Sequence, residues 1–196
     1  TTPNATTVTI IKKMSKKLKN YPDPIDVIDK YGADAVRFYL MSAPVVRAEN
    51  LRFSETGVKD VSNKLLGTLG NVLSFYKLFV NEVPNELDEA SLGALDRWIR
   101  ARLSGAVIEV TKAMETYEIS SATREIQEFV TDLSQWYIRR SRDRFRGENT
   151  LDKAVASRVL FEVLETTSRM IAPFVPFMAE HIWNEISAKG DSVHLS

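Results

Sequence analysis

Hydrophobic residues recur at steps of three and four positions along most of the chain from Ser54 onward. The first such run contains Val61, Leu65, Leu69, Val72, Leu73, Tyr76 and Phe79. This period is typical of an amphipathic helix, and Ser54 is a suitable N-cap for it. Gly67 and Gly70 lie inside the run and are poor helix formers, so they predict a bend or the close approach of a neighbouring helix.

Four more runs with the helical period follow, separated by short polar connections. They extend from Leu95 to Tyr117, from about Ser120 to the arginine-rich stretch, from Leu151 to before Pro173, and from Pro176 to about Ser187. Helices joined by short loops pack as antiparallel neighbours. The pattern therefore predicts a helical bundle over residues 54–196.

The first 53 residues predict a smaller α-rich module in front of the bundle. Asp23-Pro24 is a helix start, and Gly32 fits the end of that helix. A second short helix is expected over 33–41, and 42–53 reads as irregular. Residues 1–11 are rich in threonine and β-branched residues, so they form either a short strand or a non-native segment. The predicted fold class is mainly all-α, with domains at 1–53 and 54–196.

Composition narrows the possible functions. Formal net charge is zero, so attraction to nucleic acid depends on local basic patches. The chain has no cysteine and two histidines, which argues against a metal site. No apolar run approaches the roughly 20 residues of a membrane helix, and no signal peptide is recognisable. We expect a cytoplasmic monomer without membrane association.

Five lysines fall within the eight residues 12–19, with one serine among them. On charge alone, such a segment is usually a solvated surface loop. The alternative is a phosphate-binding loop, because flexible ammonium groups and a hydroxyl suit charge developing on a phosphate.

The order of these residues favours the second interpretation. Lys13-Met14-Ser15-Lys16, followed by Lys17, resembles the Lys-Met-Ser-Lys-Ser signature of class I aminoacyl-tRNA synthetases. The resemblance implies a catalytic loop made of these five residues. It also implies that Lys13, Ser15 and Lys16 bind ATP, with Lys16 as the strongest candidate for a phosphate contact. The fifth position departs from the signature, because Lys17 stands where serine or arginine is commoner.

Longer strings extend the similarity over residues 12–196. Lys16 to Pro24, Tyr31 to Arg37 and Pro44 to Phe53 resemble the isoleucyl-tRNA synthetase family, and the last string resembles its archaeal and eukaryotic-cytosolic branch. Leu95 to Leu103, Trp136 to Phe145 and Ile171 to Phe177 resemble elements of the anticodon-binding domain in the isoleucine, valine and leucine enzymes. The equivalent fragment of a valyl-tRNA synthetase is the second hypothesis, and the Pro44 to Phe53 string argues against it.

The resemblance implies a parent enzyme that uses ATP with Mg²⁺ to activate isoleucine and transfers it to the anticodon-bearing isoleucine tRNA. The chain shows no His-Ile-Gly-His element and no editing domain, which that family needs because a missing methylene is poorly rejected by binding alone. We therefore predict that this polypeptide is catalytically inactive alone and binds no cofactor.

An arginine-rich stretch ends the second of the four later helical runs. It contains Arg139, Arg140, Arg142, Arg144 and Arg146. One interpretation is a solvated, salt-bridged helix end. The other is contact with tRNA phosphates, with Trp136 or Tyr137 stacking on anticodon bases. The apolar period favours core packing for both aromatic residues.

Arg47 and Arg52 lie in the irregular segment between the module and the bundle. They either contact the inner side of the tRNA or link the two parts structurally. A further hypothesis of another class is a helical protein–protein interaction module without an RNA role, which a neutral composition suits equally well.

Overall fold

The computed structural model describes residues 14–15, 21–85, 88–187 and 190–195, and every regular element in these ranges is helical. The α-helices are α1 (Pro24–Tyr31), α2 (Ala33–Ser42), α3 (Glu55–Val61), α4 (Gly67–Phe79), α5 (Ala94–Glu115), α6 (Ile119–Asp132), α7 (Arg139–Arg146), α8 (Thr150–Ile171) and α9 (Pro176–Ile186). Shorter turns are η2 (Pro44–Arg47), η3 (Ser62–Leu66), η4 (Glu89–Ser91), η5 (Leu133–Ile138) and η6 (Val193–Leu195). The all-α prediction is confirmed, and the strand predicted over 1–11 lies outside the described residues.

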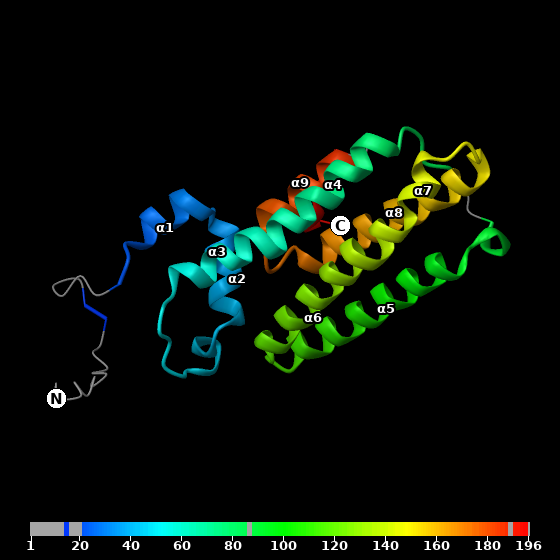
Figure 1. Ribbon diagram of the computed structural model, residues 1–196. Coiled ribbons are helices and arrows are strands. Elements are labelled where there is room, and N and C mark those ends of the chain that lie inside the picture. The colour runs from blue at the N-terminus through cyan, green and yellow to red at the C-terminus, as the bar shows by residue number, and fades with distance from the viewer. Residues whose placement is uncertain (1–13, 16–20, 86–87, 188–189, 196) are drawn as a thin grey trace, which may run out of the picture.

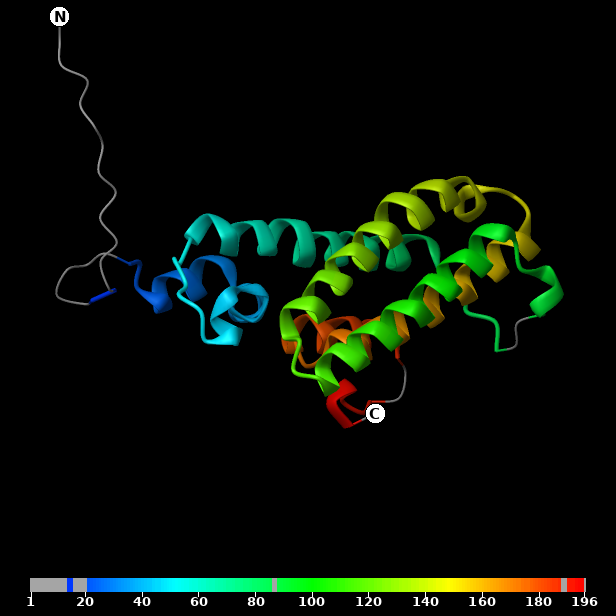
Figure 2. The same cartoon turned by 90° about the horizontal axis from the view of Figure 1, so that it is seen from below.

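The elements form a bundle with a small module at one end (Figure 1). Helices α5 and α6 run antiparallel, as do α8 and α9, while α1, α2 and η2 lie at the N-terminal end. Figure 2 shows the same module beside the start of the long helix that continues into α4. We call residues 21–53 the connecting module.

Local signals explain where the first helices begin and end. The Asp23 Oδ1 accepts a hydrogen bond from the Ile25 N–H at 2.9 Å, and Pro24 occupies the first helical position. Gly32 then adopts a φ of 87°, a left-handed conformation that residues other than glycine rarely adopt. Ser54 caps α3 by accepting from the Gly57 N–H, as predicted. Within 42–53, which was predicted to be irregular, Pro44–Arg47 forms a 3₁₀ turn.

Two long helices each contain a π-helical turn. Helices α3 and α4 are joined without a break through η3, and α6 and α7 are joined through η5. A π turn inserts one residue into the helical repeat, so side chains beyond it are rotated by roughly 100° relative to an uninterrupted helix. The prediction of a close approach is wrong at Gly70, where an added Cβ would meet no atom within 4 Å.

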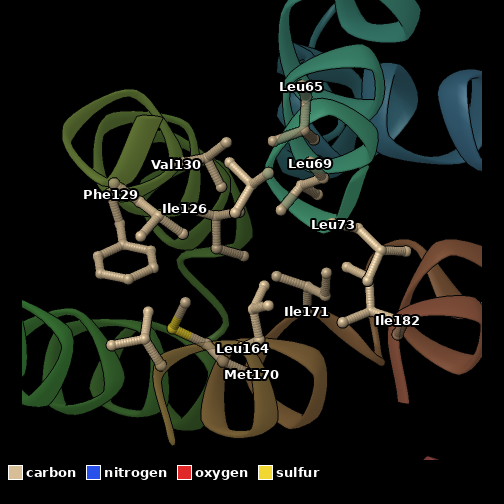
Figure 3. Packing of buried hydrophobic residues seen from close by; sticks show 14 of the residues in the cluster. Leu65, Leu69, Leu73, Ile126, Phe129, Val130, Leu164, Met170, Ile171 and Ile182 are labelled. Atoms are coloured by element: carbon tan, nitrogen blue, oxygen red, sulfur yellow. The ribbon is translucent and has the colours of Figure 1, made fainter. Parts of the chain in front are cut away.

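The core lies where α4, α6, α8 and α9 meet (Figure 3). Its members share almost complete burial of their side chains. Those labelled in the figure and fully or nearly fully buried include Leu65, Leu69, Leu73, Ile126, Phe129, Leu164, Ile171 and Ile182. Each such side chain stabilises the fold by about 1.5–3 kcal/mol, so the bundle is held mainly by this apolar layer.

Gly57→Ala and Gly70→Ala make a matched test of this packing. A Cβ at Gly57 would lie 2.5 Å from Cε2 of Tyr39, whose hydroxyl accepts from the Ser54 N–H. We expect Gly57→Ala to lower the free energy of unfolding by about 1 kcal/mol, because this steric strain exceeds the gain in helix propensity. Gly70→Ala should raise it by about 0.5–1 kcal/mol. Urea denaturation measures both, and equal effects of the two substitutions would contradict the packing at Gly57.

Candidate nucleic-acid interface

Four arginines of the arginine-rich stretch project to solvent at the bundle end opposite the connecting module. Arg139, Arg140, Arg142 and Arg146 are exposed, whereas Arg144 is largely covered. All five lie on α7, which packs against α8 (Figure 1). We call the four exposed arginines together with Trp136 the arginine surface.

Arg144 is the centre of an ionic cluster that contains one fully buried carboxylate. Its Nη1 and Nη2 donate to the two carboxylate oxygens of Asp96 at 2.8 and 2.9 Å, and its Nε and Nη2 donate to Asp152 at 2.9 and 2.7 Å. Asp96 is 0% exposed and also accepts from the hydroxyl of Tyr137 at 3.2 Å. We call Arg144, Asp96, Asp152 and Tyr137 the Arg144 cluster.

The surroundings of the Arg144 cluster keep Arg144 charged and Tyr137 neutral. Burial opposes the charged guanidinium, yet the hydrogen bonds that it donates to Asp96 and Asp152 raise the pKa of Arg144 above its ordinary value. Burial and the charge of Asp96 raise the pKa of Tyr137 well above 10, so its phenol stays protonated and donates. Two bidentate partners occupy the guanidinium, which makes Arg144 a structural residue rather than a free phosphate ligand.

Sequence reasoning missed Asp96 and Asp152. Their spacing from Arg144 is 48 and 8 residues, so no local pattern connects them. The one available signal was Asp96 itself, an acidic residue in the first turn of a helix. There it also accepts from the Gly93 N–H at 3.0 Å. Arg144 consequently ties the starts of α5 and α8 to α7.

Trp136 is presented at the surface by η5. Its side chain is 50% exposed, and the guanidinium carbon of Arg140 lies 4.4 Å from the ring centroid. The core interpretation is therefore wrong for Trp136 and confirmed for Tyr137, which is fully buried. An exposed indole with a stacked guanidinium is a flat platform on which an unstacked base can lie.

The other arginines of the surface differ in their contacts. Arg146 lies over the ring of Phe79, with its guanidinium carbon 5.4 Å from the centroid. Within the described parts of the chain, Arg139 and Arg142 have no carboxylate within salt-bridge distance. These two side chains keep their full charge available to an anion, which is the property that phosphate contact needs.

Arg47 and Arg52 lie far from the arginine surface. The Nη1 of Arg47 donates to the Ser120 Oγ at 3.2 Å, and its Nε pairs with the exposed Glu49 at 3.0 Å. Ser120 and Arg142 stand at opposite ends of the α6–η5–α7 helix, a separation of about 30 Å at 1.5 Å per residue. Arg52 is exposed, and its backbone carbonyl accepts from the Tyr39 hydroxyl.

A shallow groove of about 220 Å³ lies beside Arg47, between η2 and α6. It is lined by Ser42, Pro44, Arg47, Ser120, Thr123, Arg124 and Gln127. Arg124 is exposed and was not predicted from the sequence. The groove brings two guanidiniums and the Ser120 hydroxyl together, which suits an anionic backbone rather than an apolar ligand.

Little of the lysine-rich segment 12–19, which we call the lysine loop, is described. Met14 is half-exposed and Ser15 is partly buried, whereas Lys13, Lys16 and Lys17 lie outside the described residues. The predicted ATP contacts therefore stay predictions. Among the described residues there is no group of three or more side chains that could together hold a metal ion. No helix in these parts of the chain is long and apolar enough to cross a membrane.

Comparison with known proteins decides the family. The family described as the anticodon-binding domain of tRNA ligase matches residues 96–196, which is more than half of the chain. The chain belongs to this family. The family of class I tRNA synthetases for I, L, M and V matches residues 9–52, which include the lysine loop and all of the connecting module except its last residue.

Isoleucine–tRNA ligases are among the curated relatives of this chain. Those of Chlamydia trachomatis serovar D and Chlamydia muridarum are each 43% identical to it over 189 residues. The alignments cover 93% of this chain and 18% of each relative, so the chain spans less than a fifth of their length. The resemblance to isoleucyl-tRNA synthetases is confirmed, and the valyl alternative is not favoured. The assignment to an archaeal and eukaryotic-cytosolic branch stays a prediction.

Two solved structures share the fold of this family member. One is the LeuRS–tRNA–LeuAMS ternary complex of Agrobacterium radiobacter K84, with a TM-score of 0.66, 21% identity, and coverage of 93% of this chain and 22% of that one. The other is Mycobacterium tuberculosis methionyl-tRNA synthetase with methionyl-adenylate, with a TM-score of 0.67, 21% identity, and coverage of 87% and 35%. At this identity they support the helical fold alone.

Proposed function

We propose that this chain is the part of an isoleucine–tRNA ligase that carries the lysine loop, the connecting module and the anticodon-binding bundle. The arginine surface is the observation that carries the RNA-binding role. It places four exposed guanidiniums and a half-exposed indole at one end of an anticodon-binding bundle. Phosphate contacts from such cations set the position of an RNA, and stacking on an aromatic ring holds an unpaired base.

In this proposal the residues of the arginine surface contact different parts of the RNA. Arg139 and Arg142 bind phosphates of the anticodon stem and loop, while Trp136, backed by Arg140, stacks on one anticodon base. Arg146 adds positive charge near Phe79. Arg144 is left out of the interface, because Asp96 and Asp152 already occupy its guanidinium.

The groove beside Arg47 supplies a second, distant contact with the same RNA. Arg47 and Arg124 bind phosphates there, and the exposed Arg52 of the same module adds a third positive charge to the RNA-binding surface. About 30 Å separates this groove from Arg142 along the α6–η5–α7 helix. A single-stranded loop and its adjoining stem are long enough to reach both positions.

The remaining functions belong to the complete enzyme. There, Lys13, Ser15 and Lys16 would bind ATP, with Mg²⁺, while isoleucine is activated for transfer to its tRNA. We further propose a cytoplasmic monomer and a boundary between the two parts near residue 54. The chain alone should show no isoleucine-dependent pyrophosphate exchange, and turnover above that of a blank without the protein would contradict this expectation.

Salt dependence tests the phosphate contacts directly. Each of Arg139→Gln and Arg142→Gln should weaken binding of an isoleucine tRNA transcript. Each should also reduce the slope of log K against log salt by about 1, because fewer counterions are released. Fluorescence anisotropy between 50 and 200 mM salt measures both quantities.

Lys59→Gln is the matched control for these two substitutions. It removes the same charge from an exposed position on α3, which is neither part of the arginine surface nor in the lining of the groove beside Arg47. Its effect on the slope should be smaller than that of either arginine. If all three substitutions reduced the slope of log K against log salt equally, net charge and not the arginine surface would govern binding.

A further inference from the structure

A buried carboxylate of the connecting module caps a helix of the bundle. Asp34 on α2 is 6% exposed, and its Oδ2 accepts from the Met178 N–H at 2.7 Å. Its Oδ1 is 3.4 Å from the Phe177 N, which also donates to it. These N–H groups belong to the first turn of α9, which has no partner for them within its own helix. Asp34 therefore does for α9 what an N-cap residue does, although it lies 144 positions away in sequence.

Two neighbours of Asp34 on α2 hold the turn that precedes α9. The Nη2 and Nε of Arg37 donate to the carbonyl of Pro173 at 2.7 and 3.2 Å. The fully buried ring of Phe38 lies 6.4 Å from that of Phe174. We call the contacts of Asp34, Arg37 and Phe38 with residues 173–178 the α2–α9 contact.

The α2–α9 contact is one of the places where the connecting module meets the bundle. The chain itself enters the bundle through the continuous α3–η3–α4 helix, and η3 is a π turn, a position at which helices bend. A bend at η3 alone would leave the angle between module and bundle variable. Helix α2 and η2 also pack against α6, and the α2–α9 contact adds a further attachment of α2, so these contacts together define that angle.

We propose that Asp34 is a positioning residue for RNA binding. By capping α9 it sets the place of Arg47, on the module, relative to the arginine surface on the bundle. One RNA then contacts both surfaces at once, and the second contact is gained as an intramolecular event. This inference rests on the proposed function, because it concerns how two RNA-contacting surfaces act together.

Asp34→Asn gives a test in which charge and position act in opposite directions. The substitution removes a negative charge, so electrostatics alone would strengthen binding to RNA. An asparagine keeps one acceptor oxygen and places an NH₂ group where the other carboxylate oxygen stood, so one of the two backbone N–H groups then faces a donor. We expect tRNA affinity to fall by about tenfold and the salt slope to shrink by about 1 to 2, since the contacts at the Arg47 groove are lost.

Asp29→Asn is the matched control. Asp29 is exposed on α1 of the same module, and its substitution changes the charge equally without touching the α2–α9 contact. Its affinity for the isoleucine tRNA transcript should equal or slightly exceed that of the unsubstituted chain. A loss of affinity in both variants would overturn the positioning role of Asp34.

A distance measurement reports the position of the module without RNA. The chain has no cysteine, so Asp26→Cys on α1 and Ser104→Cys on α5, both exposed, accept one spin label each. Pulsed electron paramagnetic resonance then measures the distance between the two labels. Asp34→Asn and, separately, Arg37→Gln should broaden or shift the distribution of this distance. The exposed Arg37 provides this test even if Asp34→Asn does not fold.

The possible results distinguish the positioning role of Asp34 from the proposed function of tRNA binding. Loss of affinity with a changed distance distribution supports the positioning role. Tight binding by the unsubstituted chain, with Asp34→Asn unchanged in affinity and distance, overturns the inference and leaves the proposed function intact. Absence of salt-sensitive tRNA binding by the unsubstituted chain overturns both.

Discussion

Arg144→Met is expected to lower the free energy of unfolding by about 3–5 kcal/mol, because it leaves a fully buried carboxylate without its counter-charge. Asp96 would keep the hydroxyl of Tyr137 and the Gly93 N–H as partners, and neither neutralises it. For a chain of this length the midpoint of thermal unfolding should fall by roughly 6–20 °C. Circular dichroism at 222 nm during urea and thermal denaturation measures the change.

Arg142→Met provides the matched comparison two positions earlier. Arg142 is exposed and has no carboxylate partner among the described residues, so its removal should change stability by no more than about 0.5 kcal/mol. The same substitution should weaken tRNA binding, since it removes a phosphate contact. Equal stability losses for the two variants would contradict the assignment of Arg144 to structure and Arg142 to RNA.

Trp136→Ala is expected to weaken binding of the isoleucine tRNA transcript by about 1–3 kcal/mol, a factor of about 5 to about 150, through loss of base stacking. The indole is half-exposed and lies against Arg140, so the fold loses little when it is removed. The salt slope should stay nearly unchanged, because no phosphate contact is lost. Anisotropy titrations at two salt concentrations, with the thermal midpoint as a check, give all three quantities.

Two further variants identify stacking as the cause. Trp136→Phe keeps an aromatic face and should retain most of the affinity. Trp98→Ala removes another partly exposed indole, from the start of α5, and should leave binding unchanged. The stacking role would be wrong if Trp136→Phe and Trp136→Ala weakened binding equally.

The sequence was sufficient wherever the determinants of structure are local. Asp23, Pro24 and Gly32 set the limits of α1, and Ser54 set the start of α3, because caps and turn residues act within four positions. The limits of α8 and α9 followed from Pro173 and Pro176 in the same way. The period of apolar residues then predicted the bundle itself.

Long-range and register effects were beyond the sequence. The helical period of apolar residues predicted a core position for Trp136. That prediction failed because no feature of the sequence indicates the π turn that changes the helical register at η5. Arg144 looked like its neighbours until the fold brought Asp96 and Asp152 to it. Asp34 likewise gained its role only when α9 was placed beside α2. The sequence therefore identified the arginine-rich stretch as a candidate site, but not which of its residues the fold uses for its own structure.

The central claim is that this bundle binds an anticodon stem-loop through the arginine surface. Binding of an isoleucine tRNA transcript to the purified chain, with a valine tRNA transcript as competitor at low and moderate salt, tests it most directly. We predict salt-sensitive binding, preference for the isoleucine tRNA, and loss of affinity when Arg139 and Arg142 are replaced by glutamine. Binding that is absent at both salt concentrations, or that is indifferent to these two arginines, would contradict the claim.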